Sequence, residues 1–328
     1  MVRRMEKIKV GVVGATGMVG QRFIQLLAGH PWFDLQVVAA SGRSAGKTYG
    51  EVAPWVLPEP MPERIQSMVV QEAEPPLDCE IVFSALPSDV AAPVEKGLAE
   101  AGYLVCSNAS CYRMEEDVPL LVPEVNPDHL ALLHVQRQRR GWRGGIVTNP
   151  NCTSTGLVCA LKPLHDAFGL RKVFVVSLQA VSGAGYPGTP SLDILSNVIP
   201  HIGGEERKLE SEPQKLLGSL RDGRVEMADF VISAQCNRVP VREGHTECVS
   251  IQLETRATEA EIVQAWQSFR SVPQQLNLPT APQSFIALRD EPDRPQPFYD
   301  VDAGRGMTTT VGRLRPCNLL DWKFVLVS

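Results

Sequence analysis

A glycine-rich turn between a strand and a helix, close to the amino terminus, constrains the fold of this chain more than any other feature. The apolar stretch 8–13 is expected to form the strand, and three glycines follow it: Gly14, Gly17 and Gly20. Glycine is needed where a backbone turns tightly, approaches a pyrophosphate, or packs a helix against a strand. The helix N-terminus can then bind phosphate groups. The pattern predicts a dinucleotide site, although a glycine-rich turn without a ligand would have the same sequence.

The segments that follow extend this pattern into a sheet. The helix after the glycines is expected to bury one apolar face, made of Val19, Phe23, Leu26 and Leu27. Strands are then predicted over 35–41 and 103–110, a strand that ends in a turn over 80–88, and a helix over 90–102 that closes at Gly102. Alternating strands and helices predict a parallel sheet, so the fold class is α/β with a Rossmann-type nucleotide-binding domain.

The loop after the second predicted strand bears on which dinucleotide binds. NAD enzymes usually place an acidic residue there, next to the adenine ribose. This chain has SGRSAGKTYG instead, which supplies Arg43, Ser44 and Lys47 and no acid before Glu51. Cationic and hydroxyl groups suit a 2′-phosphate, so the loop favours NADP over NAD. An exposed basic loop with no ligand is the alternative.

Composition excludes several classes of function. The chain has 328 residues, 44% of them hydrophobic, and a net charge of −5, so a nucleic-acid or anionic-membrane partner has no electrostatic support. No apolar run is long enough for a bilayer span, and the basic amino terminus lacks the apolar core of a secretory signal. The eight cysteines form no C-x-x-C pair, which argues against a zinc site and a disulfide framework and predicts a reducing cytoplasm.

A second strand–turn–helix segment, GGIVTNPNCTSTGL, places a cysteine where a helix is expected to begin. A helix N-terminus carries partial positive charge and unpaired N–H groups, so the Cys152 thiol should ionise more easily there and could act as a nucleophile. A small buried hydrophobe is the alternative role. We expect the nucleotide-binding domain to span 1–151 and an α+β substrate and dimerisation domain to span 152–328. Cys152 then lies at a domain junction, where clefts usually form.

The second half supplies side chains that could act with Cys152. A predicted strand over 172–180 carries Gln179 near its end, before a glycine-rich loop. Arg238 and His245 lie between two further strands, and a base beside a thiolate is the usual scheme for acyl-enzyme chemistry. Spacing along the chain does not establish that the cysteine and the histidine touch. The charged run 205–208 is, taken alone, typical of a solvated helix surface.

These segments together resemble the aspartate-β-semialdehyde dehydrogenase family. The family's order is kept by VGATGMVGQRF, ASGRSAGKTYGE, SNASCYRM, PEVNPDHL, TNPNCTSTGL, LQAVSGAGYPG, GGEERK and CNRVPVREGHTE, which span nearly the whole chain. The segment 232–246, with Cys236, Arg238, Gly244 and His245 in place, is similar to the family's signature. The sequences of the segments RSAGKTYGE and QAVSGAGYPG most resemble the archaeal and fungal branch of the family.

The resemblance implies a reaction and a catalytic set. The family reduces L-4-aspartyl phosphate with NADPH to L-aspartate 4-semialdehyde and releases phosphate, on the way to lysine, methionine and threonine. By this resemblance Cys152 forms a thioester, His245 is the acid–base, and Gln179 orients the acyl group. Asn151 and the Cys152 amide are expected to hold the oxyanion, by analogy with oxyanion holes in general.

The resemblance also implies how substrate and cofactor bind. Arg238 is expected to pair with the substrate carboxylate, Glu205 with its amino group, and Lys208 and Arg113 with the phosphate. The cofactor contacts are expected from Gly14, Thr16, Gly17, Met18, Val19, Ser41, Arg43, Ser44, Ser84, Ser182 and Gly183. No metal is expected, and the family implies a homodimer or homotetramer.

Other interpretations remain open from the sequence. Family members usually continue after a DWKFV-like strand into a further helix, whereas this sequence ends at DWKFVLVS, so that helix is expected to be missing. Malonyl-CoA reductase uses similar thioester chemistry, and N-acetyl-γ-glutamyl-phosphate reductase is a more distant alternative. Glu205 and Lys208 favour an amino-acid phosphate, because malonyl-CoA has no ammonium group. A catalytically silent NADP-binding homologue is an alternative of another class, against which the intact set of Cys152, Gln179, Arg238 and His245 weighs.

Overall fold

The computed structural model describes residues 6–328 and divides the chain into two compact units. The first unit comprises the described residues up to Leu120 together with Leu130–Asn149, and the second comprises Leu121–His129 and Pro150–Ser328. The basic stretch at the very amino terminus, which bears on the signal-peptide prediction, lies partly outside the described residues. Within residues 6–328, none of the helices is long and apolar enough to cross a membrane.

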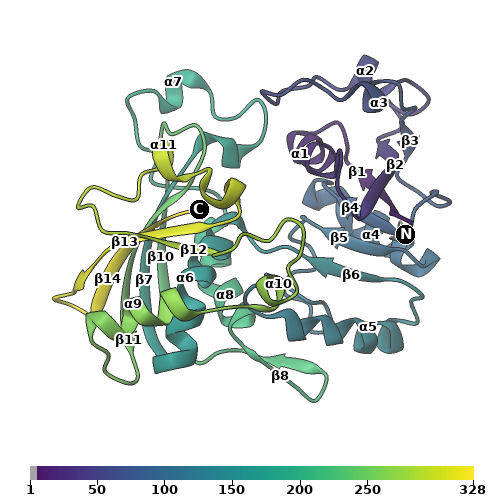
Figure 1. Ribbon diagram of the computed structural model, residues 1–328. Helices are drawn as coiled ribbons and strands as arrows, with labels where there is room; N and C mark the ends of the chain where they lie inside the picture. The colour runs from purple at the N-terminus through teal and green to yellow at the C-terminus, as the bar shows by residue number, and fades with distance from the viewer. Residues whose placement is uncertain (1–5) are drawn as a thin grey trace, which may run out of the picture. The chain divides into compact units, whose positions relative to one another are not determined.

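The first unit is built on a parallel sheet of six strands in the order β3-β2-β1-β4-β5-β6 (Figure 1). The strands are β1 (Ile8–Val13), β2 (Phe33–Ala40), β3 (Gln71–Glu72), β4 (Ile81–Ser84), β5 (Leu104–Ser107) and β6 (Gly145–Thr148). All neighbouring strands run parallel, and the order extends outward from β1 in both directions. This is the strand order of a Rossmann-type sheet, which confirms the predicted fold class of this unit.

Helices connect these strands. They are α1 (Met18–Leu27), α2 (Tyr49–Val52), α3 (Glu63–Gln66), α4 (Ser88–Ala101) and α5 (Leu132–Arg140). The α1 helix packs on β1 and β2, whereas α4 packs on β5 and β6. As the sequence predicts, α4 ends at Gly102, whose φ of 112° lies in the left-handed region that glycine adopts without strain.

The buried face of α1 differs from the prediction. Val19 and Leu26 are exposed, and the buried residues are Gly20, Gln21, Ile24 and Leu27. A Cβ atom on Gly20 would collide with the Gly14 carbonyl oxygen, so the helix approaches the glycine turn closely at this point. This backbone approach sets the rotation of the helix about its axis. The spacing of the apolar side chains is compatible with both the predicted face and the observed one. The sequence pattern alone therefore does not tell which of these two faces of α1 is buried.

The second unit contains a mixed six-stranded sheet in the order β10-β7-β11-β14-β13-β12, as expected of an α+β domain. The strands are β7 (Leu170–Gln179), β10 (Val231–Arg238), β11 (Thr246–Leu253), β12 (Ile286–Arg289), β13 (Thr309–Pro316) and β14 (Trp322–Val327). The pairs β10–β7 and β12–β13 are parallel, and the other pairs are antiparallel. The strands β8 (Ser219–Arg221) and β9 (Arg224–Glu226) form a separate hairpin.

One long helix forms the centre of the second unit. The helix α6 (Cys152–Phe168) contacts β7, β11, β13 and β14 of the sheet and the helices α8 and α9 (Figure 1). Apolar residues lie all around α6, as expected of a helix enclosed by its neighbours. The other helices are α7 (Ser191–Ile194), α8 (Glu205–Leu216), α9 (Glu259–Ser268), α10 (Val272–Gln275) and α11 (Pro297–Asp300), with short 3₁₀ turns at Pro127–Ala131, Val181–Ala184 and Ala303–Gly306.

Candidate active site

The turn before α6 places Cys152 at the first position of that helix, as the sequence predicts. Asn151 is the N-cap, and its side-chain oxygen accepts a hydrogen bond from the Thr153 amide. Glu212 on α8 accepts the Asn151 backbone N–H at 2.6 Å and so holds the turn from the other side. The position of Cys152 is therefore fixed by bonds to its two neighbours in the chain.

His245 lies against this cysteine, although 93 positions separate them in the sequence. The His245 Nε2 atom is 3.1 Å from the Cys152 Sγ atom, and its Nδ1 atom is 3.1 Å from the backbone nitrogen of Ala180. His245 directly precedes β11, and its backbone N–H and C=O both bond to Ser328, which directly follows β14. The sheet thus brings together the two side chains whose contact sequence spacing left open.

The surroundings of this pair shift the pKa values of both the Cys152 thiol and the His245 imidazole. Desolvation by the surrounding protein raises the pKa of the Cys152 thiol to about 11, although the residue keeps an exposed surface, and the negative charge of Glu205 acts in the same direction. The N–H groups of the first helical turn lower this pKa, as expected at a helix N-terminus, but burial outweighs them. Burial also lowers the pKa of His245 to about 4, assisted by the positive charge of Arg238.

Gln179 and Arg238 are the last residues of β7 and β10 and lie opposite each other in the parallel register. Both are buried, with 1% and 6% of their surfaces exposed. The Arg238 Nη1 atom donates to the Ala180 carbonyl oxygen at 2.8 Å. A Cβ atom on Gly183 would lie 2.8 Å from Arg238 Nη1 and 3.3 Å from His245 Cε1, so only a glycine lets this loop pass so close to both side chains.

Glu205 begins α8 and is buried, whereas the other three residues of the charged run 205–208 are partly or fully exposed, as expected of a solvated helix surface. Its two carboxylate oxygens accept hydrogen bonds of 2.7 Å from Asn151 Nδ2 and from Lys208 Nζ. Burial by itself would raise the pKa of this carboxyl, but the bonds from Lys208 and Asn151 hold the pKa below its ordinary value. The burial of Glu205 could not be predicted from the pattern of charges, because it depends on the packing of the first turn of α8 against α6.

The remaining predicted site residues divide between the two units. Ser182 and Gly183 belong to the second unit, and the other predicted cofactor contacts belong to the first. Arg113 also belongs to the first unit, where it is buried and donates from Nη2 to the Asn108 carbonyl oxygen at 3.0 Å. Ser84, at the end of β4, is fully buried, so its side chain is not presented at the surface of this unit.

The glycine turn of the first unit has the features of a phosphate cradle. Gly14 has a φ of 73°, and a Cβ atom there would lie 2.6 Å from the Ala85 backbone. Gly17 is the N-cap of α1 and provides no side-chain hydrogen bond to the first helical turn. Backbone N–H groups without a side-chain cap are suited to an anion. The residues present therefore fit a dinucleotide pyrophosphate.

The loop after β2 also fits the predicted preference for NADP. The Ser41 carbonyl oxygen accepts the backbone N–H groups of Ser44 and Ala45, which forms a turn at the carboxyl end of β2. Arg43 and Lys47 are exposed on this turn. A cationic, solvent-accessible loop at this place can bind a 2′-phosphate.

Sequence reasoning missed Glu212 and Glu247, which are among the buried acids of the second unit. Glu212, which holds the Asn151 amide, lies seven residues after Glu205 and so on the same face of α8, a spacing that could have identified it. Glu247 on β11 is fully buried, and neither of its carboxylate oxygens has a hydrogen-bond partner among residues 6–328. Strand alternation with the inward-facing Val249 could have placed it inside.

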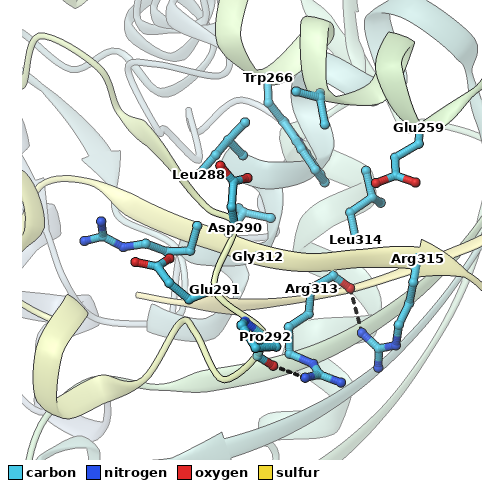
Figure 2. A pocket seen from close by; sticks show the side chains of 13 residues that line it. Glu259, Trp266, Leu288, Asp290, Glu291, Pro292, Gly312, Arg313, Leu314 and Arg315 are labelled. Atoms are coloured by element: carbon cyan, nitrogen blue, oxygen red, sulfur yellow. Dashed lines mark hydrogen bonds between the residues drawn. The ribbon is translucent and has the colours of Figure 1, made fainter.

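A groove of about 310 Å³ lies on a different part of the second unit (Figure 2). It is lined by residues of α9, β12 and β13, and it includes none of the predicted site residues. Two arginines extend along it: Arg313 donates to the Pro292 carbonyl oxygen, and Arg315 donates to the Arg313 carbonyl oxygen at 2.6 Å. This groove is therefore separate from the Cys152–His245 pair.

Two family models match the chain. A model described as the NAD binding domain of semialdehyde dehydrogenase matches residues 9–133, and a model of the dimerisation domain matches residues 161–328. The aspartate-semialdehyde dehydrogenase of Archaeoglobus fulgidus is 53% identical over 323 residues, which is 98% of this chain and 93% of that protein. The enzyme of the same name from Methanothermobacter thermautotrophicus is 54% identical over 94% of this chain and 89% of its own length.

A solved structure agrees with these matches. The crystal structure of aspartate semialdehyde dehydrogenase with NADP from Candida albicans has a TM-score of 0.91 and 43% identity, covering 98% of this chain and 93% of that one. Archaeal and fungal relatives are thus both similar to this chain, which confirms the resemblance seen in the sequence. The chain belongs to the semialdehyde dehydrogenase family.

Proposed function

We propose that this protein is an NADP-dependent aspartate-semialdehyde dehydrogenase, which converts L-4-aspartyl phosphate to L-aspartate 4-semialdehyde and phosphate in the biosynthesis of lysine, methionine and threonine. The observation that carries the proposal is the 3.1 Å contact of Cys152 Sγ and His245 Nε2, with Gln179 and Arg238 buried beside it. The names of the archaeal and fungal relatives support the same activity.

Cys152 is the nucleophile in this proposal. Its ionised sulfur attacks the acyl carbon, the bond between that carbon and the phosphate oxygen breaks, and phosphate leaves with the electron pair. When bound, NADPH supplies the hydride that reduces the acyl group. Gln179, at the end of β7, orients the acyl group relative to the sulfur. Asn151 has two amide N–H groups, and its bond to Glu205 leaves the second for the oxyanion.

The charged groups of the site suit the two ends of an aspartyl phosphate. The Arg238 guanidinium can bind the substrate carboxylate with two parallel hydrogen bonds. Glu205, whose pKa is held low by Lys208, is ionised at neutral pH and can pair with the substrate ammonium. Lys208 and Arg113 are proposed to bind the phosphate, where their charges stabilise the developing negative charge.

The cofactor is proposed to bind at the glycine turn and the loop after β2. Gly14, Thr16, Gly17, Met18 and Val19 would surround the pyrophosphate. The 2′-phosphate would contact Ser41, Arg43 and Ser44 in the loop after β2. The backbone of Ser84 and the loop residues Ser182 and Gly183 complete the proposed set. The uncapped N-terminus of α1 supports this assignment.

We further propose that the protein is a cytoplasmic homodimer or homotetramer. The chain carries a dimerisation-domain match. In the second unit, Phe174 and Val231 lie on the adjacent strands β7 and β10 with 46% and 66% of their surfaces exposed. Exposed apolar side chains on a sheet suit contact with another subunit. All eight cysteines are free, which suits a reducing compartment.

An assay in the oxidative direction tests the proposed function. The protein should reduce NADP in the presence of aspartate semialdehyde and phosphate, and the rate should vanish when phosphate is omitted. Malonate semialdehyde with CoA is the rival substrate pair. Turnover of that pair alone would identify a malonyl-CoA reductase, and no turnover of either pair by folded protein would identify a silent homologue.

A further inference from the structure

The helix α4 carries an acid in the middle of its buried face. The buried residues of this helix are Ala91, Glu95, Leu98 and Ala99, which recur at the spacing of a helix face that packs on a sheet. Glu95 is fully buried, although the other members of this face are apolar. A buried carboxyl group costs free energy unless hydrogen bonds compensate for it. None of the proposed substrate and cofactor contacts involves this side chain, so its presence in the core needs a reason of its own.

The carboxyl group of Glu95 meets the sheet where two central strands end. Ser84 is the last residue of β4 and Ser107 is the last residue of β5, and the two lie opposite each other in the parallel register. Both serines are fully buried. The Ser107 hydroxyl donates to Glu95 Oε1 at 2.7 Å. Glu95 is therefore bonded to the carboxyl edge of the sheet, which is the edge where open α/β sheets bind their ligands.

The loop after β5 depends on the direction of the Ser107 hydroxyl. Its Oγ atom accepts the Ala109 backbone N–H at 3.1 Å. A hydroxyl has a single proton, and because Glu95 accepts that proton, a lone pair is left to face the Ala109 N–H. The Asn108 N–H donates to the Ser84 carbonyl oxygen at 2.9 Å. The first two residues of the loop are thus held at the ends of β4 and β5.

The peptide group between Asn108 and Ala109 connects this bond to Arg113. Its N–H donates to Ser107, and its carbonyl oxygen, which belongs to Asn108, accepts Arg113 Nη2 at 3.0 Å. A peptide group is planar, so its N–H and its C=O can only turn together. A change in the direction of the Ala109 N–H therefore also moves the oxygen that holds the buried guanidinium of Arg113.

We infer that Glu95 is a positioning residue for Arg113, on which it acts through the Ser107 hydroxyl and the peptide group between Asn108 and Ala109. The effect on catalysis rests on the proposed function, in which Arg113 binds the phosphate, whereas the chain of hydrogen bonds does not depend on it. A guanidinium binds phosphate through directed N–H groups, so its orientation counts as well as its charge.

Two variants separate the hydrogen bond from the filling of the core. Burial raises the pKa of Glu95, against the effect of the Ser84 and Ser107 hydroxyls, and glutamine resembles the uncharged acid that burial favours. Glu95→Gln keeps a carbonyl oxygen that can accept the Ser107 proton. Glu95→Leu fills similar space but offers no acceptor. A thermal melt establishes that each variant is folded.

Hydrogen exchange at the Ala109 amide, followed by NMR of the ¹⁵N-labelled protein, tests the chain of hydrogen bonds directly. We expect exchange about tenfold faster in Glu95→Leu than in the native protein, and a native rate in Glu95→Gln. Equal rates in the native protein and Glu95→Leu would overturn the inference. This measurement needs no turnover, so it is decisive even if the assay of the proposed function fails.

The kinetic test is the phosphate dependence of NADP reduction. We expect the KM for phosphate to rise about tenfold in Glu95→Leu, the scale of one hydrogen bond, and to return to the native value in Glu95→Gln. The KM for aspartate semialdehyde should not change, because its proposed contacts belong to the second unit.

Gln136→Leu is the matched control for this test. Gln136 is a fully buried polar residue of α5 that bonds to the backbone of Ile146 and Asp117, outside the loop 107–113. Its loss should lower the melting temperature without changing the KM for phosphate. An unchanged KM for phosphate in folded Glu95→Leu, or an equal rise in Gln136→Leu, would show that Glu95 does not position Arg113.

Discussion

At the scale of single residues, the site depends on side chains whose partners are distant in sequence. His245 contacts Cys152, Glu205 contacts Asn151, and Arg238 contacts the Ala180 carbonyl oxygen. The residue types follow from the chemistry of an acyl transfer, and for that reason the sequence pointed to them. Their hydrogen bonds could not be predicted, because they depend on how β7, β10, α6 and α8 pack together.

Cys152→Ser tests whether the sulfur is the nucleophile. A serine hydroxyl at the N-terminus of α6 stays protonated, because a helix terminus lowers a pKa far too little to ionise it. We expect at most a trace of turnover, with NADPH affinity nearly unchanged because the glycine turn lies in the first unit. Steady-state kinetics and a cofactor titration measure the two quantities. Substantial activity in this variant would exclude a thioester mechanism.

Arg238→Lys tests the substrate carboxylate. Lysine keeps the positive charge but loses the planar fork that binds two carboxylate oxygens, and it also loses the bond to the Ala180 carbonyl. We expect kcat/KM to fall roughly a hundredfold, the scale of about 2 to 3 kcal/mol for a charge-assisted contact. A thermal melt is the control. If the loss of activity is matched by unfolding, Arg238 only braces the Ala180 peptide.

At the scale of secondary structure elements, some boundaries could be predicted, whereas others and the orientations could not. The strand expected over 103–110 ends at Ser107, because the apolar stretch does not show where pairing in the sheet stops. The start of α6 at Cys152, the end of α4 at Gly102 and the end of β7 at Gln179 follow from local signals, namely an Asn N-cap, a C-terminal glycine and strand alternation. The rotation of α1 and the burial of Glu205 depend on backbone contacts with other segments. No local pattern contains that information.

Two helical glycines provide a matched test of the α1 packing. Gly20→Ala would place a Cβ atom against the Gly14 carbonyl oxygen and the Ala15 backbone, so we expect it to reduce the free energy of unfolding by about 1 to 3 kcal/mol. Gly97 in α4 has open space around the Cβ position, so Gly97→Ala should increase the same quantity by about 0.5 to 1 kcal/mol. Urea unfolding measures both. Equal and small effects would mean that α1 does not approach the turn as described.

At the scale of the whole molecule, the candidate dinucleotide site and the candidate catalytic residues belong to different compact units. The glycine turn that suits a dinucleotide lies in the first, and Cys152, His245, Gln179 and Arg238 all lie in the second. The second unit also encloses Glu247, whose carboxyl has no hydrogen-bond partner in the part of the chain that the structure describes. A buried, unpaired acid affects the stability of the entire fold, because every unfolding event releases it to water.

The pH dependence of stability should report this buried acid. Burial raises the pKa of Glu247 well above its ordinary value of 4.5, so the folded protein keeps the proton at pH values where the unfolded chain has lost it. The stability contribution of Glu247 is therefore complete below pH 4.5 and declines as the pH rises towards the folded pKa, by up to about 1.4 kcal/mol per pH unit.

Glu247→Gln replaces the titratable carboxyl with an amide that does not titrate. It should therefore change how the free energy of unfolding depends on pH. We expect the variant to gain stability relative to the native protein as the pH rises above 4.5, whatever its stability in acid. Urea unfolding of both proteins over a pH series measures the difference. Glu63→Gln, which removes an exposed acid on α3, is the control for the loss of one negative charge. Native and Glu247→Gln curves that stay parallel across the series would show that Glu247 is already ionised inside the fold, and would require a cationic partner for it.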